Sequence, residues 1–179
     1  MKKTVTHTLL AIGFIGLTSL AQAGDQKAFA GPDSVQYAKD LWMALEQNRL
    51  VGKEMINGSP YDGMEPHGAI LETMDATVTI NGYTGRAIVK RNYGPSGVDM
   101  DAVKDNRAKY LGAVTVMFKR EKGYDTDHKN WFWAKFKPNG SLHLNPAGMK
   151  LAGRIAKGSD KGCIACHKGA GDDMIFTRD

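Results

Sequence analysis

The residues best suited to chemistry are two cysteines and the histidine that follows them. They form the string Cys163-Ile164-Ala165-Cys166-His167, which has the spacing of a c-type haem attachment site. Two thiols three positions apart, on a tight turn or the start of a helix, can reach both vinyl groups of one porphyrin and form thioethers. The next residue then lies beneath the iron, where a neutral imidazole is the usual axial ligand. The motif therefore predicts one covalently bound haem c with His167 as the iron ligand.

Other chemistry of a cysteine pair fits this sequence less well. A disulfide or a thioredoxin-like redox pair would need a βαβ context, and neither would explain His167. A zinc site needs four ligands, but there is no second cysteine pair, and His67, His128 and His143 are scattered along the chain. Haem c is favoured over both alternatives.

The N-terminal segment has the pattern of an export signal. Lys2 and Lys3 precede an apolar run from Leu9 to Ala21, which ends in Ala21-Gln22-Ala23. A basic start, a short apolar region and an A-x-A site predict a cleavable signal peptide over residues 1–23 and a periplasmic mature protein. The run is short for a bilayer span, so an uncleaved membrane anchor is the weaker alternative. Covalent attachment suits this location, because a lost haem would be hard to replace there.

The composition predicts a single globular domain over residues 24–179. Hydrophobic residues make up 42% and charged residues 24% of the 179 residues, which excludes a disordered or fibrous chain. The formal charge of +5 falls to +3 when Lys2 and Lys3 are removed. No basic cluster is interleaved with aromatic residues, so nucleic acid is excluded as a partner.

The elements that must position the motif follow from the period of the apolar residues. A helical period predicts an amphipathic helix over residues 34–49, with Asp33 as its N-cap and Gln36 completing a capping box. Glycine and proline predict a loop over residues 52–68. Four segments rich in β-branched and aromatic residues are predicted as strands: 69–80, 84–93, 109–122 and 130–137.

The remaining segments complete an α+β fold. Asn139-Gly140 predicts a turn, residues 146–157 a short helix, and the cysteine motif a second short helix. Short connections favour antiparallel pairing. We therefore expect an antiparallel sheet of four to five strands, an N-terminal helix and a C-terminal helical segment that carries the haem.

With its motif near the C-terminus of a strand-rich chain, the sequence resembles the cytochrome P460 family. The resemblance covers about residues 35–178 and rests on an ordered set of motifs. They are Pro66-His67-Gly68, Ile88-Val89-Lys90-Arg91-Asn92-Tyr93-Gly94, Thr115-Val116-Met117-Phe118-Lys119, Gly123-Tyr124, Asn130-Trp131-Phe132-Trp133-Ala134-Lys135, Gly162 to His167, and Asp173-Met174-Ile175-Phe176-Thr177-Arg178.

The resemblance implies a periplasmic mono-haem c protein, usually a homodimer, whose haem packs on an antiparallel sheet. The family has two functional kinds. Cytochrome P460 itself oxidises hydroxylamine, with a lysine linked to the porphyrin edge and a carboxylate in the distal pocket. Cytochrome c′-beta binds nitric oxide and carbon monoxide at an open, apolar distal face.

Two positions bear on the choice between these kinds. Lys90 matches the cross-linking lysine, although a solvated strand lysine has the same pattern. Val114 matches the position of the glutamate in the hydroxylamine-oxidising members, and a valine cannot accept a proton. If the match shifts by a residue, Ala113, Thr115 and Val116 are no better bases.

Other pocket candidates have structural interpretations. Phe118, Trp131 and Trp133 are expected to pack in the core or on the haem, and a structural role is favoured for His67 over a place at the haem edge. Met117 and Met174 are conceivable sixth ligands of the iron, but nothing in their spacing selects either. The resemblance implies an open sixth position.

Two functions from different classes follow. The first is binding of small ligands such as nitric oxide or carbon monoxide at an open haem face, which Val114 favours. The second is an oxidoreductase that oxidises hydroxylamine or nitric oxide and passes electrons to another periplasmic cytochrome, which Lys90 favours. A plain electron shuttle is a third, and it would require a sixth protein ligand. The sequence leaves open whether the protein is an enzyme.

Overall fold

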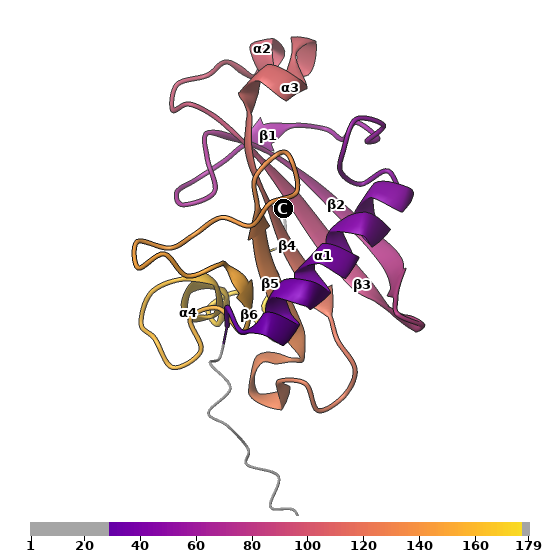
Figure 1. Ribbon diagram of the computed structural model, residues 1–179. Coiled ribbons are helices and arrows are strands. Elements are labelled where there is room, and N and C mark those ends of the chain that lie inside the picture. The colour runs from indigo at the N-terminus through magenta and orange to yellow at the C-terminus, as the bar shows by residue number, and fades with distance from the viewer. Residues whose placement is uncertain (1–28, 177–179) are drawn as a thin grey trace, which may run out of the picture.

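A computed structural model describes residues 29–176, and its centre is one antiparallel sheet of six strands in the order β1-β2-β3-β4-β5-β6 (Figure 1). Each strand pairs with the next one along the chain. The strands are β1 (Tyr61–Asp62), β2 (Ile70–Ile80), β3 (Tyr83–Tyr93), β4 (Leu111–Lys119), β5 (Trp131–Phe136) and β6 (Ala152–Gly153). The α+β prediction is confirmed. The sheet exceeds the predicted four to five strands because a two-residue strand is added at each edge.

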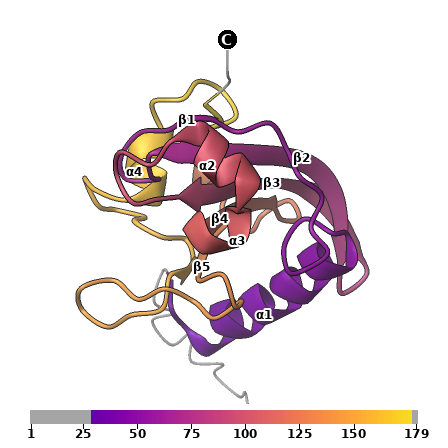
Figure 2. The same cartoon turned by 90° about the horizontal axis from the view of Figure 1, so that it is seen from above.

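The helices lie on both sides of this sheet. They are α1 (Pro32–Gln47), α2 (Met100–Asp105), α3 (Arg107–Tyr110), the 3₁₀ turn η1 (Thr126–His128) and α4 (Cys163–His167). Helix α1 crosses one face of the sheet, and α4 with the C-terminal segment lies on the other side (Figures 1 and 2). We call these the α1 face and the α4 face.

Strand alternation assigns each residue of the sheet to one face. In β3, Ala87 and Val89 join the core beneath α1, whereas Ile88 joins a separate cluster that contains Ile164 of α4. Antiparallel pairing carries this assignment to the neighbouring strands. The α1-face core includes Leu41, Leu45, Val78, Val89, Val114, Val116, Phe118, Phe132 and Phe136.

Helix α1 forms where the apolar period predicts it, but its start differs. Its N-cap is Gly31, with Pro32 at the first helical position and no side-chain capping bond. The predicted Asp33 capping box is therefore wrong. Proline's fixed φ and missing N–H favour the first turn, so the helix begins before Asp33. The Gln36 amide donates instead to Asp40, over 2.9 Å.

A fully buried ion pair completes the α1 face. Arg91 donates to the Glu72 carboxylate over 3.1 Å and to the Leu50 carbonyl over 2.8 Å. The Tyr93 hydroxyl and the Arg107 guanidinium donate to the same carboxylate, over 2.7 and 2.8 Å. This network joins the loop after α1 to β2 and β3.

The predicted helix over residues 146–157 is wrong. The Asn145 side chain accepts hydrogen bonds from the Ala147 and Met149 amides, over 3.0 and 2.9 Å, and Leu144 pairs with Lys150 as an isolated bridge. A side chain that bonds its own backbone in this way competes with helix formation. The segment forms a turn and then β6 at the sheet edge.

Of the other local predictions, some are confirmed and some are wrong. The Asn139-Gly140 turn is confirmed, with Gly140 at a φ of 83° and its amide bonded to the Lys137 carbonyl. Residues 109–110 belong to α3 rather than to a strand, and α2 was not predicted. Within residues 29–176, no helix is long and apolar enough to cross a membrane. The predicted signal peptide, residues 1–23, lies outside the described residues.

Candidate haem site

The cysteine motif forms the short helix α4, as predicted. Gly162 precedes it with a φ of 111°, and a Cβ there would come within 2.7 Å of the Ala156 side chain, so this position requires glycine. Ile164 is completely buried and its amide donates to the Ile155 carbonyl over 3.2 Å. These contacts anchor α4 to the segment that follows β6.

The two thiols of α4 differ in their surroundings. Cys163 is half-buried, Cys166 is exposed, and both are free thiols. Burial raises the pKa of the Cys163 thiol to about 11, with nearby Lys135 acting in the opposite direction. Cys163 is therefore a protonated thiol at neutral pH, close to the sheet.

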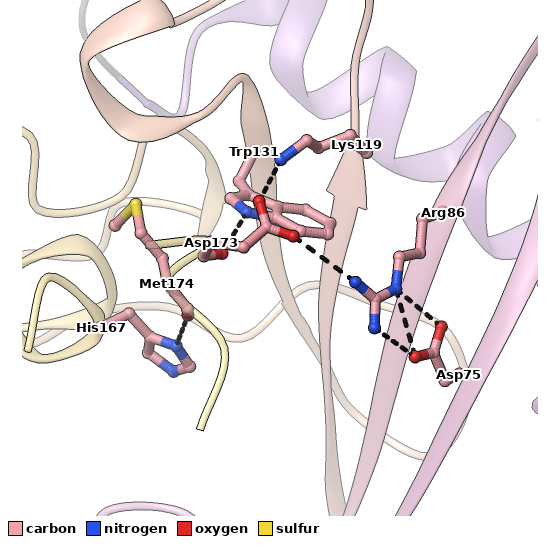
Figure 3. Close-up of polar contacts among 7 residues, drawn as sticks. All are labelled: Asp75, Arg86, Lys119, Trp131, His167, Asp173 and Met174. Carbon is pink, nitrogen blue, oxygen red and sulfur yellow. Dashed lines mark hydrogen bonds and ion pairs between the residues drawn. The ribbon is translucent and has the colours of Figure 1, made fainter. Parts of the chain in front are cut away.

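His167 is oriented by a backbone carbonyl. Its Nδ1 lies 2.8 Å from the Met174 carbonyl, which can only accept, so Nδ1 carries the hydrogen (Figure 3). In the neutral ring this leaves a lone pair on Nε2, which is the form that binds a metal. Burial lowers the pKa of His167, the bond to Met174 opposes this, and Lys90 adds to it. The Trp133 and Phe176 rings pack against the imidazole, at 4.8 and 5.2 Å between centroids.

The segment that orients His167 is itself fixed to the sheet. Trp131 donates from Nε1 to the Asp173 carbonyl over 2.9 Å, and the Asp173 carboxylate pairs with Lys119 and Arg86 (Figure 3). Arg86 also pairs with Asp75 of β2. The carbonyls of Asp173 and Met174 thus have fixed positions above the α4 face.

Two rows of side chains cross the α4 face beneath His167. Ile88, Met117 and Trp133 are paired across β3, β4 and β5 and form an apolar row. Two residues further along each strand, Lys90, Thr115 and Lys135 are paired in the same way, and we call them the lysine row. Burial lowers the pKa of Lys90. His143 continues the row, because its amide donates to the Lys135 carbonyl over 2.9 Å.

His67 lies above the lysine row. Its Nδ1 is 3.3 Å from the Thr115 hydroxyl, and its ring centroid is 6.2 Å from that of His167. Burial, and then the charges of Lys90, His167 and Lys135, lower the pKa of His67 to about 4. Lys90 influences the pKa of both histidines, so the structure brings together the predicted Lys90, His67 and His167.

The placement of Val114 in the pocket is wrong. Val114 is 1% exposed in the core beneath α1, on the face opposite to His167. A shift of one residue along a strand reverses the face, and Ala113 and Thr115 therefore face α4. Neither is a carboxylate. Phe118 also lies in the α1-face core, whereas Trp131 and Trp133 lie on the α4 face.

The two methionines considered as sixth ligands are both buried on the α4 face. Met117 belongs to the apolar row. Met174 contacts His167 through its carbonyl, and its thioether extends away from the imidazole (Figure 3). Lys135, Asn92 and His143 were not predicted as site residues. The alternation of Asn92 with Lys90 in β3, and of Lys135 with Trp133 in β5, is the sequence signal that would have placed these two residues on this face. His143 follows only from its pairing with Lys135 in the folded chain.

Comparison with known proteins agrees with this geometry. The sequence model of the family described as cytochrome P460 matches residues 71–177. The chain belongs to the cytochrome P460 family. No curated protein and no solved structure matches it significantly. Membership of the family implies a c-type haem as the cofactor.

Among residues 29–176 no group of three or more His, Cys, Asp or Glu side chains could hold a metal ion.

The α4 face fits a c-type haem. Three buried polar atoms on this face have no partner among the described residues: Asn92 Nδ2, Trp133 Nε1 and His143 Nε2. Buried polar groups are normally paired, so three on one face indicate a missing partner. The half-buried Lys90 and Lys135 have no carboxylate partner within residues 29–176, and the propionates of a haem are carboxylates. The free thiols of Cys163 and Cys166 and the His167 imidazole, with its lone pair on Nε2, lie on the same side of the sheet.

Proposed function

We propose that this protein is a periplasmic mono-haem c cytochrome that binds small nitrogen-oxide ligands such as nitric oxide at its iron. Cys163 and Cys166 would hold the haem through thioethers, and His167 would bind its iron through Nε2. The haem would supply an iron that binds diatomic ligands and exchanges single electrons. The protein holds His167 as the Nδ1–H tautomer and packs Trp133 and Phe176 around it.

The observation that carries this proposal is the charge of the surroundings. No carboxylate contributes to the pKa shifts of His67, Lys90 or His167. Asp75 and Asp173, which lie at this face, are paired with Arg86 and Lys119. Oxidation of hydroxylamine releases protons as electrons leave, and a positioned base contributes about 10²–10⁴-fold to such transfers. Binding of nitric oxide needs no base.

Lys90 supports a second candidate function, oxidation of hydroxylamine or nitric oxide with electron transfer to another periplasmic cytochrome. It lies on the α4 face near His167, and its lowered pKa increases the fraction of neutral amine. A neutral amine is the form that can bond to a porphyrin carbon. The cross-link found in cytochrome P460 itself would then involve Lys90.

The export and assembly of the protein belong to the same proposal. Residues 1–23 would be removed as a signal peptide, leaving residues 24–179 as one haem domain. Family likeness supports a homodimer. Mass spectrometry of the purified periplasmic protein and light scattering test these points directly.

Two measurements test the function. Nitric oxide or carbon monoxide added to the reduced protein should give a saturable 1:1 optical change, and hydroxylamine with an artificial acceptor should be turned over slowly. Steady hydroxylamine oxidation that Thr115→Glu does not increase would favour the enzyme. For the cofactor, Cys163→Ala with Cys166→Ala should release haem into acidified organic solvent, whereas retention of haem would exclude thioether attachment. An unchanged Soret band in Lys90→Ala would exclude the cross-link.

A further inference from the structure

His67 comes from a segment remote from α4, yet it lies beside His167. The ring centroids are 6.2 Å apart and the planes are nearly perpendicular, at 87°. One metal ion at the usual metal–imidazole distance of about 2 Å can reach both rings across such a separation. Gly68 fixes this approach, since it has a φ of 129° and a Cβ there would lie 2.9 Å from the Tyr93 carbonyl. The turn before β2 therefore holds His67 close to β3.

Thr115 lies beside the Nδ1 atom of His67. Its hydroxyl is 3.3 Å from Nδ1 and 3.4 Å from both the Lys90 carbonyl and the Asn92 side-chain oxygen. When the hydroxyl donates to one of these two oxygens, it accepts from Nδ1–H of His67, and the lone pair of the neutral ring is on Nε2. His167 has the same arrangement, with the Met174 carbonyl in the place of Thr115.

His67 is half-buried, and the side chains that face it are those of Thr115, Lys90, Lys135 and His167. None of them is a carboxylate.

We infer that His67 is a reversible sixth ligand: its Nε2 binds the haem iron in the ligand-free protein and is displaced by an incoming small molecule. This inference rests on the proposed function, and it adds a control on access to the same site. The two imidazoles are held unequally, which explains the exchange. His167 lies on a helix and has a buried bond of 2.8 Å, whereas His67 lies in a turn and has a part-buried bond of 3.3 Å.

The test uses the full haem-loaded protein and four variants. Electron paramagnetic resonance of the ferric wild type should show a low-spin centre with two imidazole ligands. His67→Ala and His67→Gln should be high-spin, and added imidazole should restore the low-spin signal in His67→Ala. His128→Gln is the control, because His128 is paired with Asp125 through Nδ1 and belongs to neither row of the α4 face, and it should keep the wild-type spectrum.

Ligand kinetics give a second readout. If His67 occupies the iron in about 90% of molecules, only about a tenth can bind carbon monoxide at once, and His67→Ala should bind it about tenfold faster. A high-spin wild type that matches both His67 variants would overturn the inference. So would a loss of the low-spin signal in Lys90→Met with retention in His67→Ala. Failure of the proposed function looks different, since neither wild type nor His67→Ala would form a carbon monoxide or nitric oxide adduct.

Discussion

Lys90 and Arg91 are neighbours in β3, but they point to opposite faces of the sheet and into very different surroundings. Arg91 is fully buried on the α1 face and donates to Glu72 and to the carbonyls of Leu50 and Ile56. Lys90 is half-buried on the α4 face, and among residues 29–176 no acceptor bonds its ammonium group.

The same contrast extends over both faces. On the α1 face the Tyr37 hydroxyl is the buried polar atom without a partner in the described chain, and on the α4 face there are three such atoms. The α1 face is completed by the protein's own helix and loops. The α4 face has thiols, imidazoles and ammonium groups whose partners the described chain does not supply. The α1 face is therefore a protein core, whereas the α4 face has the properties of a surface that binds a ligand.

The most direct test of the difference between the two faces is the same substitution at two adjacent positions of β4. Val114→Glu places an unpaired carboxylate in the α1-face core, and we expect it to destabilise the protein by more than about 4 kcal/mol. Thr115→Glu places the carboxylate between Lys90 and Lys135, directly opposite both, and should change the free energy of unfolding by less than about 1 kcal/mol. Urea unfolding measures both. Equal losses would mean that the two faces are not distinct.

A smaller effect is expected for the adjacent cations of β3. Arg91→Met leaves Glu72 with Arg107 but without its fully buried partner, and should cost about 3–5 kcal/mol. Lys90→Met in the haem-free Cys163→Ala, Cys166→Ala background removes an ammonium group that has no carboxylate partner, and its stability should lie within about 0.5 kcal/mol of that of the haem-free parent. Thermal unfolding of the two variants under the same conditions gives the comparison. A large loss for Lys90→Met would indicate that the described chain does satisfy this ammonium.

Removal of the haem should affect the two faces unequally. In the Cys163→Ala, Cys166→Ala variant, amide exchange should accelerate in residues 63–69 and 154–176, because these segments carry His67, His167 and the Met174 carbonyl that orients His167. Exchange in α1 and in the β2–β3 pair should change little, since those elements pack on the α1-face core. Hydrogen exchange with mass spectrometry resolves these segments. Uniform acceleration would show that the α1-face core is not stable without the haem.

The smallest effect concerns the pH dependence of stability. Burial, with Lys135 and Lys137, lowers the pKa of His143, although the Gly112 carbonyl opposes this. The unfolded chain therefore takes up a proton near pH 6.5, whereas folded His143 takes one up only at a lower pH, so stability falls as the pH drops below about 6.5. His143→Gln should flatten this part of the curve. A variant curve parallel to that of wild type would exclude His143 as a contributor.

The sheet was predictable because its residues alternate strongly and glycine-containing turns separate its strands. The haem motif was predictable because the spacing of Cys163, Cys166 and His167 is local. The helix predicted over 146–157 failed because the Asn145 side chain bonds its own backbone. The placement of Val114 in the pocket was wrong because successive side chains of a strand point to opposite faces. An error of one residue in the motif match therefore changes the face.

The role of His67 depends on contacts that no sequence pattern contains. His67 reaches the site through a turn before β2, and its Nδ1 lies beside the Thr115 hydroxyl, which is itself close to the Lys90 carbonyl of β3. These partners lie 48 and 23 positions away from it along the chain, so only the folded sheet brings them together.

The way in which His167 is oriented bears on how freely this site can change. Its Nδ1 hydrogen bond ends on the backbone of Met174, and that of Trp131 ends on the backbone of Asp173. Every amino acid has a carbonyl, so a substitution at position 174 keeps the acceptor as long as the chain follows the same path. The acceptor of His167 therefore does not depend on which side chain stands at position 174, whereas an insertion or deletion between 168 and 174 would move it.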